Sequence, residues 1–353
     1  MLSRRYENDN KPLLKLNALQ LRMKQQVEQK VKDGSYEFEE VPCPVCDGKS
    51  FESLAEKDRY GLYMPVVICR DCGLIQTNPR MNQNAYNEFY NDEYRPLYVG
   101  KENPTGEFFR GQYNKGRRIF EYLQANGLLK TYEDIFVLEI GCGAGGILHY
   151  FREQGCRVMG VDLGESYIEY GKCQYDLDLS FGTINTLDLN EAPNLIIYSH
   201  VLEHILTLND ELQNVFNILS DDGLLYIEVP GVKNLMNSYA LDFLRLLQNA
   251  HTYHFTLKSL NNMVKRNGFE LLAGNEVVCS AFGKVQNEDS SMGVENDYSD
   301  VMKYLQRIEL VRSLCPIPPY KVKHLPKYIA IRTLKAIGLF EPVRNLYHKI
   351  KTS

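Results

Sequence analysis

Long apolar runs are absent from this sequence of 353 residues. No stretch approaches the roughly 18–20 consecutive apolar residues that a membrane-spanning helix requires. The first residues, MLSRRYENDNKPLL, also lack the apolar core of a secretory signal. Apolar residues make up 44% of the chain and charged residues 24%, which is close to the globular average, and no internal repeat or low-complexity tract is present. We therefore expect a soluble, cytoplasmic, globular protein.

A strong excess of one charge is also missing. Forty basic residues against 45 acidic ones leave a formal net charge of −5, which argues against a dedicated nucleic-acid-binding protein. The charge is nevertheless uneven, because residues 301–353 carry 11 Lys or Arg against two acids. This basic C-terminal region mixes its charges with Ile, Leu and Phe. Two interpretations stay open: weak peripheral contact with an anionic membrane, or docking on the protein's own acidic body.

Cysteine occurs nine times, an odd number that a disulfide framework does not explain. Cytosolic thiols usually stay reduced, so we expect metal binding or burial. Two Cys-x-x-Cys pairs stand 22 residues apart, and they comprise Cys43, Cys46, Cys69 and Cys72. Each pair places two thiolates on one tight turn, and two pairs complete the four-sulfur shell that zinc prefers. Since protein fills all four positions, the spacing predicts a closed, structural zinc site.

The hydrophobic pattern divides the chain into four regions. A helical composition over 13–31 precedes the cysteine segment, and apolar strands then alternate with helical stretches from 114 to 285. This alternation predicts a mostly parallel sheet with helices on both faces. Strands are expected at Ile135–Ile140, Arg157–Val161, Asn194–Ser199 and Gly223–Val229, with a final pair at Phe269–Leu272 and Glu276–Phe282. The predicted regions are a helical arm (1–38), a zinc-binding domain (39–98), an α/β domain (99–287) and a basic helical region (288–353).

A glycine-rich turn follows the first strand of the α/β domain. The segment Glu139-Ile140-Gly141-Cys142-Gly143-Ala144-Gly145 permits a tight turn and close approach of the backbone to a ligand, beside the unpaired N–H groups of a helix start. The next strand ends at Asp162, 21 residues after Gly141. An acid at this distance can accept hydrogen bonds from both hydroxyls of an adenosine ribose. Turn and acid together predict a site for an adenosine-containing ligand.

Two further motifs accompany the glycine turn: Gly160-Val161-Asp162, and Ser199-His200-Val201-Leu202-Glu203-His204 after a later strand. With them, the sequence resembles the class I S-adenosylmethionine-dependent methyltransferases. The resemblance implies a Rossmann-like α/β fold with a mostly parallel seven-stranded sheet, preceded by a zinc-ribbon-like domain and followed by C-terminal helices. It also implies that the glycine turn holds the methionine moiety of the cofactor. The cofactor-binding residues that it implies are Glu139, Gly141, Cys142, Gly143, Gly145, Asp162, Leu163, Thr183, Ile184 and Ser199.

The N-terminal segment narrows this resemblance. Cys72-Gly73-Leu74 is followed by Pro79-Arg80, and later by Phe89-Tyr90 and Tyr94-Arg95. Together with the segment AHTYHFT at 250–256, this pattern is similar to the zinc-binding methyltransferases of bacterial deoxysugar and surface-polysaccharide pathways. The resemblance implies a small-molecule acceptor, a sugar or nucleotide-linked sugar, for the methyl group.

A sugar hydroxyl, or a carbon next to a ketone, must lose a proton when it is methylated, and histidine is the usual base near neutral pH. Four of the seven histidines fall in two clusters. We predict that His251 binds the acceptor or takes its proton, with His254 and His200 as further candidates. Packing or capping stays open for His251, and His200 could serve as a pocket wall.

The pair Glu203-His204 has two interpretations. It starts a helix in many methyltransferases, which gives it a structural role. Some O-methylating members of the family instead hold a divalent metal with such a pair and a distant histidine, here His251 or His254. Those members have a glutamate where this chain has His200.

Two other functions stay open at this point. The fold could bind without catalysis, or the chain could be a zinc-ribbon methyltransferase that acts on nucleic acid such as RNA. The intact glycine turn and Asp162 argue against the first, and the acidic body argues against the second.

Overall fold

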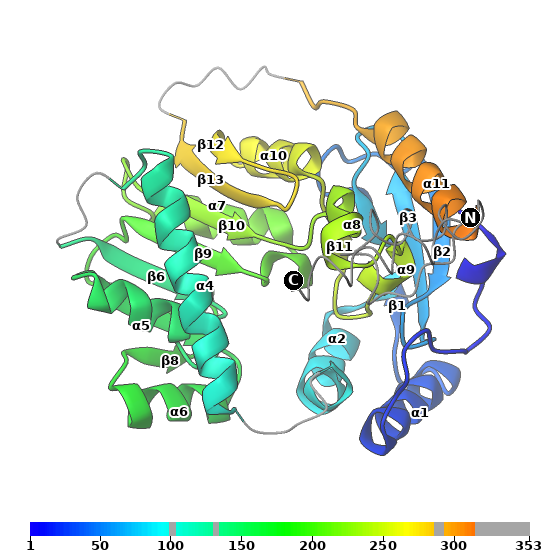
Figure 1. Cartoon of the computed structure of the whole chain (residues 1–353), viewed down its shortest axis with the longest axis horizontal. Helices are drawn as coiled ribbons and strands as arrows, with labels where there is room; N and C mark the ends of the chain where they lie inside the picture. Colours follow the sequence, from blue (N-terminus) through cyan, green and yellow to red (C-terminus); the bar gives the residue numbers. More distant parts are fainter. Residues whose placement is uncertain (99–103, 130–133, 286–292, 315–353) are drawn as a thin grey trace, which may run out of the picture.

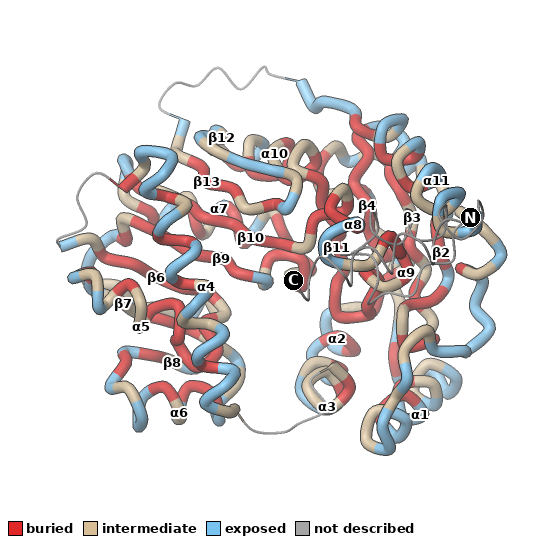
Figure 2. The backbone as a smooth tube through the Cα atoms, viewed as in Figure 1, coloured by how far each residue is buried: buried red, intermediate tan, exposed pale blue. Residues whose placement is uncertain are grey.

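The computed structural model describes residues 1–98, 104–129, 134–285 and 293–314 of the chain. Two sheets organise it, one of seven strands and one of four, with the helices around them (Figure 1). Figure 2 shows that the strands of both sheets are largely buried, whereas the exposed surface lies mainly on helices and connections. Among the described residues, no helix is both long and apolar enough to cross a membrane.

The seven-stranded sheet has the strand order β12-β13-β10-β9-β6-β7-β8. Strands β10, β9, β6, β7 and β8 are parallel neighbours, whereas β13 pairs antiparallel with both β10 and β12. This confirms the predicted Rossmann-like α/β fold, including its final antiparallel pair. The bounds are β6 Phe136–Ile140, β7 Arg157–Asp162, β8 Leu179–Phe181, β9 Leu195–Ser199, β10 Leu224–Glu228, β12 Phe269–Gly274 and β13 Cys279–Lys284. The sequence pattern does not predict β8, because three residues are too few to show one.

The central strands read as continuous apolar runs because helices cover both faces of the sheet. All residues of β6 and β9 are buried. On one face, Val137 and Ile197 pack with α4 (Gly106–Ala125), α5 (Gly146–Glu153) and α6 (Glu165–Tyr175). On the other face, the residues next to these two in the same strands pack with α7 (Leu208–Ile218) and α10 (Leu257–Arg266).

The second sheet is antiparallel and has the order β11-β4-β3-β2. Its first three strands in the chain are β2 (Phe51–Lys57), β3 (Tyr63–Cys69) and β4 (Ile75–Thr77), beside a small pair of β1 (Phe38–Glu39) and β5 (Arg80–Met81). Strand β11 (Tyr253–His254) pairs with β4 although it lies far along the chain. After β10 the chain therefore returns to the N-terminal sheet, through η5 (Val232–Asn234), α8 (Leu235–Ser238) and α9 (Phe243–Leu246). The predicted boundaries of the four regions stay a prediction.

The N-terminal arm contains η1 (Arg4–Tyr6) and the helix α1 (Ala18–Lys32). The helix starts later than the composition over 13–31 predicts, because Asn17 forms a capping box with Gln20. Three short helical elements follow β5: α2 (Gln83–Phe89), the π-helical turn η2 (Tyr90–Tyr94) and α3 (Arg95–Tyr98). We call Gln83–Tyr98 the cap segment.

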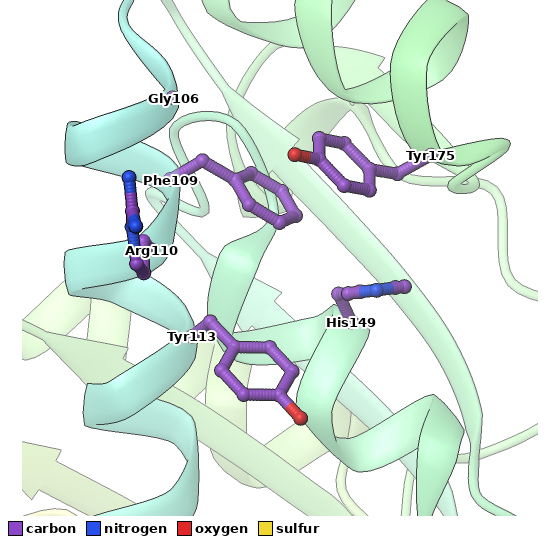
Figure 3. A pocket seen from close by; sticks show the side chains of 6 residues that line it. All are labelled: Gly106, Phe109, Arg110, Tyr113, His149 and Tyr175. Carbon is purple, nitrogen blue, oxygen red and sulfur yellow. The ribbon is translucent and has the colours of Figure 1, made fainter.

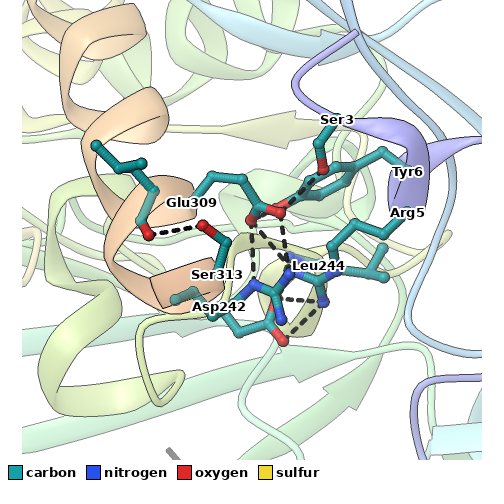
Figure 4. Close-up of polar contacts among 9 residues, drawn as sticks. Ser3, Arg5, Tyr6, Asp242, Leu244, Glu309 and Ser313 are labelled. Carbon is teal, nitrogen blue, oxygen red and sulfur yellow. Dashed lines mark hydrogen bonds and ion pairs between the residues drawn. The ribbon is translucent and has the colours of Figure 1, made fainter. Parts of the chain in front are cut away.

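The helix α11 (Tyr298–Leu314) is the described part of the basic C-terminal region. Figure 4 shows how the N-terminal turn holds it. Arg5 donates to both carboxylate oxygens of Asp242, at 2.8 Å each, and lies 3.3 Å from Glu309 of α11. Ser3 donates to the same glutamate at 2.9 Å. The two ends of the described chain are thus joined through α9.

Candidate active site

The glycine turn lies between β6 and α5, at the carboxyl edge of the seven-stranded sheet. Gly141, Gly143 and Gly145 have φ angles of 70°, 56° and 76°, in the left-handed region that favours glycine. A Cβ on Gly141 would lie 2.3 Å from a methyl carbon of Val201, so a larger residue does not fit. Gly145 precedes α5 and supplies no side-chain cap, and the Gly146 N–H at the helix start lies 3.5 Å from Gln112 Oε1 of α4.

Asp162 ends β7 beside this turn. Its carboxylate accepts hydrogen bonds from the backbone N–H groups of Gly143, at 2.8 Å, and Gly164, at 2.6 Å. A third partner is the guanidinium of Arg95, at 3.2 Å, a residue that is not among the predicted site residues. The acid is therefore fixed in orientation by the glycine turn itself.

The other predicted cofactor residues surround the same sheet edge. Glu139 is buried, its Oε2 has no hydrogen-bond partner, and burial raises its pKa well above the ordinary value. The Ser199 Oγ is likewise buried without a partner. Cys142 keeps its thiol buried, while Leu163 is 49% exposed next to Asp162.

Thr183 and Ile184 follow β8, the strand beside β7. Thr183 caps the short turn η3 (Ile184–Thr186), and Ile184 is buried in the core under it.

His200 follows β9 and carries a left-handed backbone, with φ at 59°. This conformation is rare outside glycine and is often retained at functional sites. The imidazole lies between two carboxylates, with Nδ1 3.5 Å from Glu203 and Nε2 3.5 Å from Glu228. Burial opposes the charged form, but the two facing carboxylates outweigh it and raise the pKa of His200. Its side chain is 40% exposed, so the ring is accessible.

A buried cluster lies behind His200, formed by Glu203 and His204 in the turn η4 (Leu202–His204) and by His251. The two histidine rings meet edge to face at 4.7 Å, and His251 Nε2 is 3.8 Å from the Glu203 carboxylate. Burial lowers the pKa of His251 well below the ordinary value, so the ring is neutral at neutral pH. Thr252 fixes the approach of the two segments, because its N–H donates to the backbone carbonyl of Glu203.

His254 has different surroundings from the other predicted histidines. It lies in β11 within the N-terminal sheet, is 2% exposed and packs edge to face on Phe243. Its ring is 6.1 Å from that of His251, and it does not belong to the cluster with Glu203.

The cap segment adds tyrosines to the site. The rings of Tyr90 and Tyr94 stack at 4.3 Å, and each meets His204 edge to face, at 6.0 and 5.7 Å. Burial raises the pKa of Tyr94 to about 12, and the carboxylates of Glu203 and Asp162 both contribute to the rise. Tyr94 therefore lies within electrostatic range of both the histidine cluster and the acid beside the glycine turn.

Comparison with known proteins bears on this geometry. Residues 112–273 match a family model described as a methyltransferase domain. The ubiquinone biosynthesis O-methyltransferase of Bartonella quintana is 25% identical over 195 residues, which are 51% of this chain and 76% of that protein. Its counterpart in Bartonella tribocorum is 26% identical over 148 residues, 40% of this chain and 58% of that protein.

Residues 112–273 form a methyltransferase domain, and its sheet has the class I S-adenosylmethionine-dependent methyltransferase fold. Among solved structures, a TehB-like S-adenosylmethionine-dependent methyltransferase from Corynebacterium glutamicum is 19% identical, with a TM-score of 0.35 over 57% of this chain and 100% of that one. The chain spans less than two thirds of the length of several of the curated relatives that it matches.

The four predicted zinc ligands of the methyltransferase meet in space. The Sγ atoms of Cys43 and Cys72 are 3.4 Å apart, those of Cys46 and Cys69 are 3.5 Å apart, and all four lie within 4.8 Å of one another. Sulfurs at the corners of a tetrahedron with zinc bonds of about 2.3 Å would be about 3.8 Å apart. A disulfide would need about 2.05 Å. The donor set and its spacing therefore fit zinc.

A second donor set comprises Glu203, His204 and His251, whose ligand atoms also lie within 4.8 Å of one another. Both oxygens of Glu203 and the Nδ1 atoms of both histidines are buried without a hydrogen-bond partner. Carboxylate and imidazole groups are common ligands of divalent metals, so these residues fit such an ion.

A separate cavity of about 350 Å³ lies between α4, α5 and the end of α6 (Figure 3). Its lining comprises Gly106, Phe109, Arg110, Tyr113, His149 and Tyr175. None of the predicted site residues lines it.

Four residues that meet the site had no predicted role: Glu228, and Tyr90, Tyr94 and Arg95, which the sequence marks only as part of the N-terminal motif. The tyrosines carry a signal, because Tyr86, Tyr90, Tyr94 and Tyr98 recur every four residues. In an α-helix of 3.6 residues per turn, such a stripe drifts by about 40° at each step. The wider π-helical turn at Tyr90–Tyr94 counteracts this drift.

Proposed function

We propose that this methyltransferase transfers the methyl group of S-adenosylmethionine to a small polar acceptor, a sugar or nucleotide-linked sugar, with His251 accepting the acceptor's proton. The observation that carries the proposal is the cluster of Glu203, His204 and His251 at the same sheet edge as the glycine turn. Tyr94 and Arg95 join the two, since the Tyr94 ring meets His204 edge to face and Arg95 donates to Asp162.

The cofactor's part follows from the turn and its acid. The glycine turn would receive the methionine moiety, and Asp162 would accept hydrogen bonds from the ribose hydroxyls. When bound, the cofactor would supply an electrophilic methyl group whose bonding electrons stay with sulfur as the acceptor atom takes the methyl carbon, and the chain's part would be to hold the two in line. Holding both reactants in line can lower the barrier by about 7–11 kcal/mol.

His251 has the properties of a proton acceptor. Its lowered pKa keeps it neutral, and its unprotonated nitrogen is Nε2, to which the Gln248 amide donates, so the acceptor would displace that amide when it passes its proton to the ring. The Glu203 carboxylate, 3.8 Å from Nε2, would stabilise the imidazolium that forms. Gln248, which hydrogen-bonds both His251 and Arg59, fixes the ring. His200 would form the wall of the site and hold a proton between its two glutamates.

A sugar is favoured by the polarity of the surroundings. Imidazoles and carboxylates supply hydrogen bonds for hydroxyl groups, and the stacked rings of Tyr90 and Tyr94 supply apolar faces. Incubating the protein with labelled S-adenosylmethionine and a panel of nucleotide sugars and catechols tests this. Label that enters only catechols would contradict the sugar proposal and leave methyl transfer intact.

A second candidate is metal-assisted O-methylation, favoured by the unpartnered donor atoms of the same cluster. Glu203, His204 and His251 would hold a divalent ion, which would polarise the acceptor hydroxyl. Ubiquinone biosynthesis O-methyltransferases are among the relatives, so a phenolic acceptor belongs to this candidate. Turnover that disappears with a chelator and returns with added Mg²⁺ would favour it over the His251 base.

The predicted membrane contact of the basic C-terminal region concerns residues 321–351, which lie outside the described residues. Truncation after Leu314 retains α11, whose Val301 and Leu305 are buried in the core around the N-terminal sheet. If the region contacts lipid, full-length protein should float with anionic liposomes and the truncated protein should not. Equal flotation would contradict the contact.

A further inference from the structure

The cap segment is held from outside by the helical arm. Lys30 of α1 lies 2.6 Å from Glu93 and 2.7 Å from Glu88 of the cap. Tyr36 donates to the other oxygen of Glu93 at 2.6 Å, and Gln20 donates to the carbonyl of Leu97 at 2.8 Å. Glu93 is 1% exposed, so these contacts form a buried anchor. The arm and the cap therefore behave as one packed unit.

The opposite side of the cap touches the cofactor site through Arg95. Its guanidinium lies 3.2 Å from Asp162 Oδ1 and 3.9 Å from the centre of the Tyr167 ring. Gly164 leaves the space for it, because a Cβ there would stand 2.2 Å from a guanidinium nitrogen. The side chain is 27% exposed, so it can leave this position without disrupting a core.

The Asp162 carboxylate has too few free acceptor positions for a ribose that donates both of its hydroxyls. A carboxylate offers about four lone-pair positions, two on each oxygen. The N–H of Gly164 and the guanidinium of Arg95 occupy the two lone-pair positions of Oδ1. On Oδ2, the N–H of Gly143 takes one, which leaves one position. A ribose that donates both of its hydroxyls to this acid needs two.

We propose that Arg95 competes with the cofactor ribose for Asp162, so that cofactor binding displaces the Arg95 guanidinium from the carboxylate. The inference rests on the proposed role of Asp162. Without the cofactor, the Arg95 guanidinium occupies an acceptor position of the Asp162 carboxylate. The ribose displaces this guanidinium from Oδ1. The displaced guanidinium keeps its contact with the face of Tyr167, which limits the cost of the exchange.

Calorimetric titration with S-adenosylhomocysteine tests the competition without any acceptor. Arg95→Met keeps the aliphatic stem over Tyr167 but removes the donor, and we expect its affinity to rise by about three- to tenfold, as for a partly exposed charged hydrogen bond. In an Asp162→Asn background the same substitution should change the affinity by less than about twofold, because the competed carboxylate is gone. Arg117→Met, an exposed arginine of α4, is the matched control and should bind like wild type.

The outcomes separate the two proposals. If wild-type protein binds neither S-adenosylmethionine nor S-adenosylhomocysteine, the proposed function itself fails. If binding is normal but Asp162→Asn has wild-type affinity, the ribose is held elsewhere and the competition is wrong. If Arg95→Met binds more weakly than wild type, Arg95 is a cofactor ligand. Unchanged affinity would also overturn the competition.

Discussion

At the scale of single residues, some side chains of the site have nearly all of their hydrogen-bonding positions filled, whereas others are buried with positions left unfilled. Asp162 is nearly saturated by two backbone N–H groups and a guanidinium. Glu203 and His251 are instead buried with unpartnered atoms, which costs stability unless a ligand, water, metal or proton uses them. Such unpaired groups are a reason to place the chemistry at this cluster.

Asp162→Ala should weaken binding of S-adenosylmethionine by roughly 1.5–3 kcal/mol, because two hydrogen bonds to a charged acceptor are lost. Calorimetry measures the change, and Asp188→Ala, which removes an exposed acid, is the control. Wild-type affinity in Asp162→Ala would show that the ribose is bound by other groups.

His251→Ala should leave cofactor binding nearly intact and lower turnover by roughly 10²–10⁴-fold if the residue is the base. Since burial lowers the pKa of His251, wild-type turnover should persist below the ordinary histidine pKa of about 6.5, where an exposed base would already be protonated. His149→Ala, in the separate cavity, is the control. Turnover equal to wild type would return His251 to a packing role.

At the scale of elements, the cysteine turns link the N-terminal sheet to the methyltransferase domain. Arg266 of α10 donates to the carbonyl of Val45 at 3.0 Å, and Asn209 of α7 donates to that of Pro44 at 3.1 Å. In the second turn, Gly73 has a φ of 84° and lies against the start of α11, where a Cβ would be 2.5 Å from the Tyr298 nitrogen. The turns are thus built into the surface on which other elements pack.

We expect purified protein to contain about one zinc per chain, on the four-thiolate stoichiometry. Cys72→Ser should lose the metal and loosen the N-terminal sheet, which would increase hydrogen exchange in β3 and β4. Cys173→Ser, at an exposed position of α6, should retain both metal and protection. Metal-free protein whose N-terminal sheet stays fully protected would contradict the zinc site.

At the scale of the whole molecule, the chain is closed by contacts between its distant parts. The N-terminal turn, α9 and α11 meet at the cluster of Arg5, Asp242 and Glu309 (Figure 4). Strand β11 completes the N-terminal sheet from within the methyltransferase half. Neither half is therefore packed independently of the other, and we expect perturbations at one to reach the other.

Arg5→Ala should destabilise the protein by about 2 kcal/mol, below the 3–5 kcal/mol of fully buried pairs, because it leaves the carboxylate of Asp242 largely buried without its guanidinium. Denaturant unfolding followed by circular dichroism measures this. Arg4→Ala, at an exposed position of the same turn, is the control and should be nearly neutral. A neutral Arg5→Ala would mean that the cluster does not hold α11.

Acid should destabilise the fold through His254. Burial lowers its pKa to about 3, whereas an unfolded histidine titrates near 6.5. The contribution to stability is therefore fully present above pH of about 6.5 and falls as pH drops toward 3, by up to about 1.4 kcal/mol per unit. His254→Gln should flatten the pH dependence of unfolding, and an unchanged slope would show that other groups cause it.

The sequence by itself determined the parts that local pattern controls. Continuous apolar runs such as Leu195–Ser199 fix central strands covered on both faces, and the glycines at 141, 143 and 145 take the positive φ angles that their spacing suggests. The Cys-x-x-Cys spacing likewise anticipates the cluster of four sulfurs. In each case the responsible residues are near neighbours in the chain.

Tertiary structure alone decided which distant residues meet. His251 joins Glu203 and His204 because the chain returns to the N-terminal sheet, and Thr252 then hydrogen-bonds back to the backbone of Glu203. Arg95 reaches Asp162 because the helical arm packs the cap segment against the sheet edge that carries the glycine turn. Contacts between such distant residues depend on which helices and strands pack against each other. The sequence does not determine them, because hydrophobic periodicity indicates only which face of an element is buried.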